Sequence, residues 1–204
     1  MTSLVSAIIL AAGESKRMGK LKQLLPLGQD TILGQTIDNF LNSKAAETIV
    51  VIGYRAQEII NAIGNRPVKI ALNPSYQQGM STSISAGLKL ISDKSQGIMI
   101  VLADQPFISN QTIDRLIGVF SSSHKGIVIP AHKGRQGNPV IFNIQYKQEL
   151  LALKGDVGGK EIIARHPEDV IKINFDSDDI IHDLDTEDNY NQARGEIAKS
   201  RKNA

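Results

Sequence analysis

Short apolar runs alternate along the chain with longer segments in which apolar residues recur every three or four positions. The runs are typical of buried strands, and the longer segments are typical of amphipathic helices. The alternation predicts a mostly parallel sheet covered by helices on both faces, which is a three-layer α/β fold. The expected strands cover residues 4–10, 49–52, 68–72, 98–102 and 127–129, with two more near 170–175 and 180–184.

Helices are predicted between these strands, because Thr31 and Ser109 have the side chains that cap helix starts. Past Pro130, glycines and prolines interrupt the pattern before the apolar run 140–142. The expected helices begin after Thr31, at 55, at Ser81 and after Ser109, then on either side of 155–160, and finally near 186.

Composition limits the classes of protein that this chain can be. It has 204 residues, 41% of them hydrophobic, and reads as one domain over residues 1–198 with a polar tail at 199–204. The net charge of +2 argues against nucleic acid as a main partner, and the absence of cysteine excludes thiolate chemistry. No stretch approaches the roughly 20 apolar residues that cross a bilayer, so a cytoplasmic protein with no membrane partner is expected.

The loop after the first strand, residues 10–22, is the best candidate for a binding site. Small residues let backbone N–H groups approach an anion, and basic side chains can hold phosphate oxygens. Nucleotides bind at such a loop in open α/β sheets. Neither the dinucleotide fingerprint nor the P-loop pattern is present, and an ordinary basic surface loop is the alternative. The candidate residues are Leu10, Ala11, Ala12, Gly13, Arg17 and Lys22.

Two later stretches follow expected strands and carry polar groups. Asn73, Gly79 and Ser81 lie where a base, a ribose or phosphates can be contacted, although a loop with a serine helix cap is an equally good interpretation. Asp104 follows a wholly apolar strand, and a carboxylate there needs a partner. Mg²⁺ is a fitting partner, because it takes oxygen ligands; the alternative is an aspartate that caps the next helix.

An acidic stretch near the C-terminus offers a second carboxylate. Asp183 and Asp185 point the same way if the chain is extended there, and one of them can join Asp104 on a metal. A solvated acidic start of a helix is the alternative. The four histidines are scattered, and no serine nucleophile motif is present. These features together indicate metal-assisted phosphoryl chemistry, which requires positioning more than a protein nucleophile.

The loop resembles the L-A-x-G-x-S-x-R-M-G-x-x-K signature of the molybdopterin nucleotidyltransferase family. Eight of its residues fall on that signature, namely Leu10, Ala11, Gly13, Ser15, Arg17, Met18, Gly19 and Lys22. Further motifs extend the resemblance over nearly the whole chain: Asn73-Pro74, residues 79–83, residues 103–107, Pro130, Gly134, Gly137, Pro139, Phe142, residues 155–158 and residues 183–188. The resemblance implies a Rossmann-like nucleotidyltransferase fold.

Within that family the chain is similar to the cytidylyl branch. The guanylyl branch usually has a second glycine where Ala12 stands and a methionine where Gln105 stands. The resemblance therefore implies transfer of CMP from CTP to the terminal phosphate of molybdenum-loaded molybdopterin, with release of pyrophosphate. The product, molybdopterin cytosine dinucleotide, would pass to a molybdenum hydroxylase.

The resemblance also implies roles for the candidate residues. Arg17 and Lys22 would hold the triphosphate, and Asp104 with Asp185 would hold Mg²⁺. The backbone of residues 10–13 would bind the base and ribose, together with Asn73, Gly79 and Ser81. The acceptor would lie near Gly137, Asp156 and Lys160. Two other functions remain open: a nucleotidyltransferase that uses GTP or another acceptor, and a cofactor-delivery protein without activity.

Overall fold

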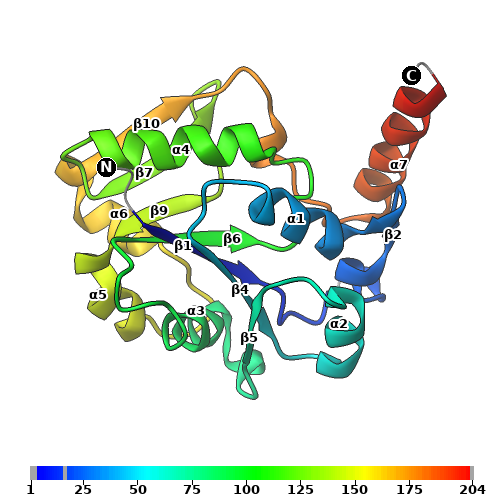
Figure 1. The fold of residues 1–204 in the computed structure, drawn as a ribbon, viewed down its shortest axis with the longest axis horizontal. Coiled ribbons are helices and arrows are strands. Elements are labelled where there is room, and N and C mark those ends of the chain that lie inside the picture. The colour runs from blue at the N-terminus through cyan, green and yellow to red at the C-terminus, as the bar shows by residue number, and fades with distance from the viewer. Residues whose placement is uncertain (1–3, 16–17, 203–204) are drawn as a thin grey trace.

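The computed structural model describes residues 4–15 and 18–202. Within this part of the chain an eight-stranded sheet has the order β10-β7-β9-β6-β1-β4-β5, and β8 pairs with β7 (Figure 1). The strands are β1 (Val5–Leu10), β4 (Glu47–Ile52), β5 (Lys69–Leu72), β6 (Gly97–Leu102), β7 (Ile127–His132), β8 (Arg135–Gln136), β9 (Val140–Asn143) and β10 (Val170–Asn174).

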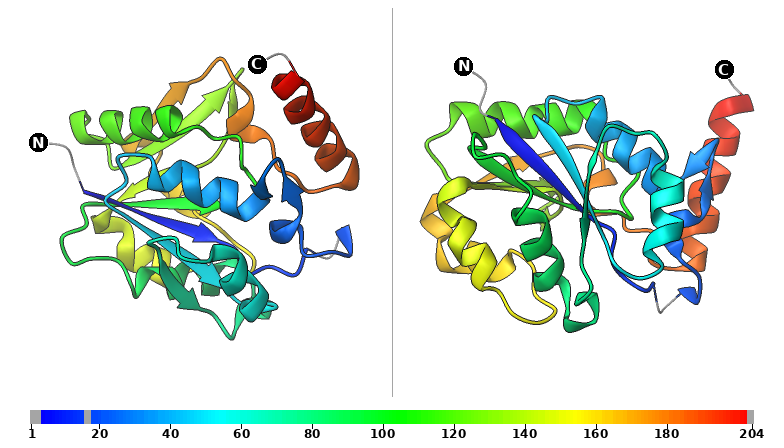
Figure 2. Two further views of the ribbon diagram at one scale, coloured as in Figure 1. Left: turned by 45° about the vertical axis from the view of Figure 1, so that its right-hand side comes forward. Right: turned by 60° about the horizontal axis from the view of Figure 1, so that its bottom comes forward.

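Helices cover both faces of this sheet, as predicted. One hydrophobic cluster joins the sheet to α1, α2 and α4, and another joins its opposite face to α3, α5 and α6 (Figure 2). The helices are α1 (Ile32–Leu41), α2 (Ala56–Ile63), α3 (Met80–Leu88), α4 (Asn110–Ser122), α5 (Lys147–Ala152), α6 (Lys160–Arg165) and α7 (Glu187–Lys202). The three-layer, mostly parallel α/β fold is confirmed.

The position of β1 at the centre of the sheet explains why every residue of this strand except Ser6 is apolar. Ala7 and Ile9 are buried in the first cluster, whereas Ile8 is buried in the second. A parallel strand with helices on both faces has no solvent-facing side, so both sets of side chains are apolar. β1 pairs in parallel with β4 and with β6. Their carboxyl ends therefore lie at one edge of the sheet.

The predicted caps are present at both expected helix starts. The side chain of Thr31 accepts a hydrogen bond from the Gly34 N–H at 3.0 Å, and Ser109 accepts one from the Thr112 N–H at 3.1 Å. Each bond satisfies an N–H that the first helical turn leaves without a partner.

The structure differs from the predicted elements in the last third of the chain. The run 140–142 forms β9, which is antiparallel to both β6 and β7. The prediction of a strand over 180–184 is wrong, because Asp179–Ile181 forms a 3-10 turn and irregular chain follows. The backbone of this segment bonds to loops instead: Asn138 N–H donates to the Ile180 carbonyl, and Leu184 N–H donates to the Asp104 carbonyl.

A small hairpin and the last helix form a separate cluster beside the sheet. The hairpin pairs β2 (Pro26–Leu27) with β3 (Asp30–Thr31), and the Tyr190 hydroxyl of α7 donates to the Pro26 carbonyl at 2.7 Å. Leu27, Leu184 and Tyr190 are buried there. This packing holds residues 183–185 across from the first loop. The division into a domain of 1–198 and a tail of 199–204 stays a prediction.

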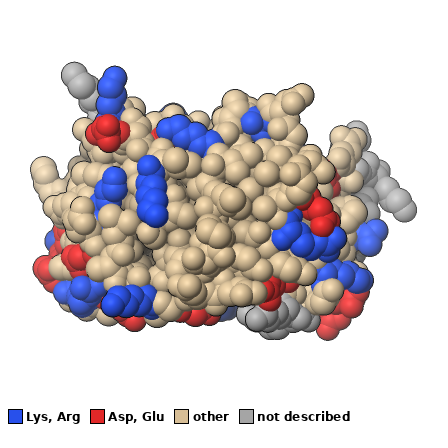
Figure 3. Space-filling view, turned by 90° about the horizontal axis from the view of Figure 1, so that it is seen from below, with Lys and Arg blue, Asp and Glu red and all other residues tan. Residues whose placement is uncertain are grey.

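The edge strand β5 exposes apolar side chains to solvent. Ile70 is 39% exposed and Leu72 is 63% exposed. Seen from below, charged side chains lie mainly toward the margins of the molecule, and other residues occupy most of the middle of that face (Figure 3).

Across the described residues, no helix has the length and apolar character that a membrane span requires.

Candidate active site

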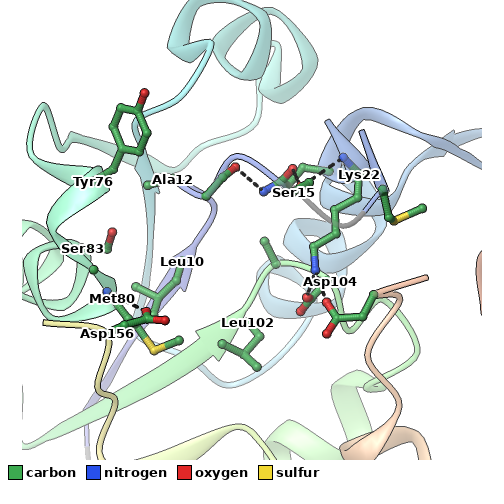
Figure 4. Close-up of a pocket in the computed structure, with 16 residues that line it drawn as sticks. Leu10, Ala12, Ser15, Lys22, Tyr76, Met80, Ser83, Leu102, Asp104 and Asp156 are labelled. Atoms are coloured by element: carbon green, nitrogen blue, oxygen red, sulfur yellow. Dashed lines mark hydrogen bonds and ion pairs between the residues drawn. The ribbon is translucent and has the colours of Figure 1, made fainter. Parts of the chain in front are cut away.

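A cavity of about 380 Å³ opens at the carboxyl ends of β1 and β6. The first loop forms one wall, and the start of α3 and the end of β6 form the others (Figure 4). Its position matches the predicted ligand-binding edge of the sheet. It is lined by Leu10, Ala12, Gly13, Ser15, Met18, Lys22, Gln23, Tyr76, Gly79, Met80, Ser83, Leu102, Ala103, Asp104, Asp156 and Asp185.

Charge is concentrated at one end of this cavity, where Lys22 pairs with two carboxylates. Its Nζ donates to Asp104 Oδ2 and, at 2.5 Å, to Asp185 Oδ1. The Lys22 and Asp104 side chains are each 14% exposed, and the Asp185 side chain is 28% exposed. Burial opposes the charge on Lys22, but the two carboxylates outweigh it and raise the pKa of Lys22 above its ordinary value. The ammonium therefore stays charged throughout the neutral range.

The first loop is held in shape by a side chain that the motif analysis did not single out. Gln23 is buried; its Oε1 accepts from the Ser15 hydroxyl at 3.1 Å, and its Nε2 donates to the Gly13 carbonyl at 3.3 Å. These bonds tie the start of the loop to its end. The only sequence sign of this role is a glutamine amid the apolar residues of a turn.

Three consecutive backbone N–H groups at the start of the loop differ in their hydrogen bonding. The Ala11 N–H donates to the Val51 carbonyl at 2.8 Å, and the Ala11 side chain is buried in the core, so Ala11 supports the cavity from behind. Among the described residues, the N–H groups of Ala12 and Gly13 have no hydrogen-bond acceptor, and both residues line the cavity. Such N–H groups suit an anion or the acceptor edge of a base.

The other end of the cavity has no cationic side chain among the described residues and is formed largely by the start of α3. Tyr76, Met80 and Ser83 line it, as does the Asp156 carboxylate, which lies near the Met80 N–H at 3.3 Å (Figure 4). Gly79 has a φ of +108°, and a Cβ there would lie 2.3 Å from the Gly155 backbone carbon. Only glycine permits this close approach between the two loops.

Two of the predicted nucleotide-binding residues, Asn73 and Ser81, do not line this cavity. Both are buried and border a neighbouring depression on the far side of the α3 start. The Asn73 amide is used inside the loop, and the Ser81 N–H donates to the Gly155 carbonyl at 3.2 Å. Their positions do not support direct contact with base or ribose; Ser83 is the residue of α3 whose hydroxyl lies at the cavity.

The structure also separates Asp183 from Asp185, which were expected to point the same way. Asp185 lines the cavity, whereas Asp183 accepts from Gln105 Nε2 at 2.6 Å and lies outside the cavity lining. Burial, followed by the charge of Asp104, raises the pKa of Asp183 above its ordinary value. The irregular chain between them breaks the two-residue repeat of a strand.

Asp104 and Asp185 fit a Mg²⁺ ion in the number and type of their oxygens. Asp104 Oδ1 is buried and has no hydrogen-bond partner among the described residues. No group of three or more metal-binding side chains gathers within this part of the chain. A metal here would therefore complete its shell with water and phosphate oxygens, as Mg²⁺ usually does in nucleotide sites.

The remaining predicted residues are divided between the cavity and other places. Of the proposed acceptor residues, Asp156 lines the cavity, but Gly137 is buried against the Ile180 carbonyl and Lys160 begins α6 outside the cavity lining. Arg17, predicted to hold phosphate, lies outside the described residues.

Known proteins resemble this chain over most of its length. The family described as the MobA-like NTP transferase domain matches residues 7–170. The molybdenum cofactor cytidylyltransferase of Escherichia coli (strain K12) is 29% identical over 193 residues, covering 94% of this chain and 96% of that protein. The nicotine blue oxidoreductase of Paenarthrobacter nicotinovorans is 28% identical over 189 residues, covering 89% and 92%.

Solved structures share the fold over nearly the full length. Rv0371c from Mycobacterium tuberculosis H37Rv superimposes with a TM-score of 0.86 at 26% identity, covering 96% of this chain and 99% of that one. A second structure of Rv0371c, a complex with manganese, has a TM-score of 0.82 at 24% identity and covers 96% and 100%. The chain belongs to the family of MobA-like NTP transferase domains and is a nucleotidyltransferase.

Proposed function

We propose that this enzyme transfers CMP from CTP to the terminal phosphate of molybdenum-loaded molybdopterin, using Mg²⁺. The observation that carries the proposal is the polarity of the cavity: Lys22, Asp104 and Asp185 form a charged end, and Tyr76 and Ser83 lie at an end without a described cation. A nucleoside triphosphate has the same division between phosphates and base. The 29% identity to a molybdenum cofactor cytidylyltransferase over 94% of the chain supports this choice of substrates.

The chemistry needs charge neutralisation at the α-phosphate. An oxygen of the acceptor phosphate attacks the α-phosphorus of CTP, the bond from that phosphorus to the α–β bridging oxygen breaks, and pyrophosphate leaves with the bond's electrons. Lys22 has three N–H donors, and two of them already bond to Asp104 and Asp185. The third is free to meet a phosphate oxygen and to stabilise the charge that develops during transfer.

Asp104 and Asp185 would hold the metal ion. Mg²⁺ bound there would neutralise phosphate charge and orient the triphosphate. In the cavity as it stands, Lys22 supplies the charge that keeps these two carboxylates close together. Arg17 is proposed as a second phosphate ligand from the same loop.

The choice of CTP rests on the cavity wall beside the proposed base. Ala12 lines the cavity and is 2% exposed within the hydrophobic cluster of that face of the sheet. We propose that its methyl group limits the space where the guanylyl branch has glycine. A pyrimidine needs less room than a purine. The acceptor is proposed to enter near Asp156, and the product is proposed to pass to a molybdenum hydroxylase.

The experiment is to incubate the protein with Mg²⁺, each of the four NTPs in turn, and molybdenum-loaded molybdopterin, and to identify the product by mass. The proposal predicts molybdopterin cytosine dinucleotide from CTP as the main product. A panel of sugar phosphates and alcohols replaces molybdopterin in parallel reactions. Turnover with one of these instead, or with GTP in preference to CTP, contradicts the proposal. Binding of the cofactor without any turnover also contradicts the proposed reaction.

A further inference from the structure

The hydroxyl of Ser83 lies at the cavity wall, and among the described residues its proton is donated to no acceptor. Ser83 is 6% exposed, lies on α3, and lines the cavity at the end away from Lys22 (Figure 4). Its Oγ accepts a hydrogen bond from the Asn73 side-chain amide at 3.0 Å. A hydroxyl has one proton and two lone pairs, so this bond leaves the proton free to donate.

The surrounding hydrogen bonds account for every other polar group of the cluster. The second amide proton of Asn73 goes to Thr82 Oγ1 at 2.9 Å, and Asn73 Oδ1 accepts from the Ser75 N–H at 3.0 Å. The Thr82 hydroxyl in turn has the Gly79 carbonyl at 2.9 Å as an acceptor. The hydrogen-bond donors of the Asn73 and Thr82 side chains therefore all have acceptors within this segment.

Ser83 differs from these neighbours, because the described part of the chain offers its proton no acceptor. A nearly buried donor without an acceptor costs free energy, and that cost is recovered when a ligand supplies the acceptor. Asn73 meanwhile fixes the Oγ from the protein side. The arrangement is a single, pre-positioned hydrogen-bond donor facing the cavity.

Charge indicates which part of a nucleotide meets this donor. Phosphates belong at the Lys22 end, where Lys22 and the Mg²⁺ proposed at Asp104 and Asp185 would supply positive charge, whereas the Asp156 carboxylate at the Ser83 end has no cation beside it among the lining residues. Ala12 and Gly13 of the first loop also line the cavity. The base therefore falls at the end that Ser83 lines.

We propose that the Ser83 hydroxyl reads the base of the nucleotide by donating to the acceptor edge of cytosine, O2 or N3, and that Asn73 is a positioning residue that holds this hydroxyl. The inference rests on the proposed use of CTP and adds the residue that reads the base. Neither Ser83 nor Asn73 takes part in the transfer itself, because Lys22 and Asp104 lie at the other end.

The test is calorimetric binding of CTP to the full chain carrying Ser83→Ala, with steady-state kinetics beside it. We expect CTP affinity to fall about 3–10-fold, which corresponds to one hydrogen bond of ordinary strength. KM for CTP should rise by a similar factor, while kcat stays near the wild-type value. Ser85→Ala is the matched control, because Ser85 lies on the same helix, outside this cavity, at the neighbouring depression.

Two CTP analogues show whether the base is the partner. In 2-thio-CTP sulfur replaces O2, and in 3-deaza-CTP a C–H replaces N3, so each lacks one good acceptor. We expect the wild type to bind one analogue about 3–10-fold more weakly than CTP, and Ser83→Ala to bind that analogue and CTP equally. A variant that keeps the wild-type discrimination, or that binds CTP as tightly as the wild type, overturns the inference.

These outcomes separate the inference from the proposed function. A wild-type protein that binds GTP but not CTP overturns both. A wild-type protein that makes the cytosine dinucleotide, with CTP affinity unchanged in Ser83→Ala, overturns the role of Ser83 alone.

Discussion

Replacing Lys22 by methionine removes one positive charge from the candidate active site and keeps most of the side-chain volume. Lys22 is the described cation that lines the cavity, and it contacts both carboxylates proposed to hold the metal. If its charge acts on the transition state, kcat should fall by about 10²–10³, or about 2.7–4 kcal/mol of barrier. The measurement is pyrophosphate release at saturating CTP and acceptor, with kcat and KM determined separately.

The same substitution should also lower stability, which the sequence did not lead us to expect. The loop 10–22 is small and polar, and from the sequence alone Lys22 has no packing role. In the structure its loss removes the ammonium that lies between the Asp104 and Asp185 carboxylates and pairs with both. Breaking a buried ion pair costs about 3–5 kcal/mol, and an exposed pair is worth about 0–1 kcal/mol. Because this cluster is partly exposed, we expect a loss of about 1–3 kcal/mol in urea unfolding without metal.

Two further variants separate the possible causes. Lys20→Met is the matched control, because the Lys20 side chain is 65% exposed and pairs with Glu187 at 3.5 Å; kcat and stability should stay near wild type. Adding Asp185→Asn to Lys22→Met relieves the carboxylate repulsion and should recover part of the stability but none of the activity. A Lys22→Met enzyme whose defect lies wholly in KM would refute a transition-state role and leave Lys22 a binding residue.

Three more substitutions test other parts of the account. Asp104→Asn should abolish Mg²⁺-dependent turnover in a folded protein, since an amide is a poor Mg²⁺ ligand; near-normal turnover would contradict the metal site. Ala12→Gly should raise kcat/KM for GTP relative to CTP without full reversal, because one methyl group is worth about 1–3 kcal/mol; an unchanged ratio means that the base is read elsewhere. Tyr146→Phe removes a hydrogen bond to Asp169 and should cost about 1–3 kcal/mol in urea unfolding near neutral pH. Burial and then Asp169 raise the pKa of Tyr146 to about 12, so the wild type should lose this stability as the pH rises from about 10 through 12, and the variant should show no such loss; equal alkaline profiles would contradict it.

The sequence predicted the layers of the fold and the edge of the sheet at which the cavity opens, because both follow from hydrophobic patterning. β1, apart from Ser6, and β6 are apolar runs, and residues that follow them, Gly13 and Asp104, meet at one cavity as expected. A parallel sheet brings such positions together whatever the loops do in detail.

The sequence could not assign the side chains at the start of α3. Gly79 precedes the helix, which begins at Met80, so Ser81 and Ser83 lie two positions apart within one helix. Two residues turn a helix by about 200°, and the hydroxyls therefore face different sides. The starting residue sets which one meets the cavity, and it is fixed by the close approach of Gly79 to Gly155 rather than by local sequence.

The segment 180–184 was predicted wrongly for a related reason. Its apolar residues Ile180, Ile181 and Leu184 suit a short strand, yet its backbone pairs with the loops at Asn138 and Asp104. Ile180 and Leu184 are both buried, so their apolar character reflects burial of an irregular segment and not a strand. The partner of Asp104 in this structure, Lys22, is likewise a contact across 82 positions of sequence, and spacing alone does not predict it.

The most direct test of the central claim follows the phosphates of CTP through the reaction with molybdenum-loaded molybdopterin. Label at the α-phosphate should appear in the dinucleotide product, and label at the γ-phosphate should appear only in pyrophosphate. Transfer of the γ-label to the acceptor, or no transfer of the α-label with CTP when GTP supports it, would contradict the account.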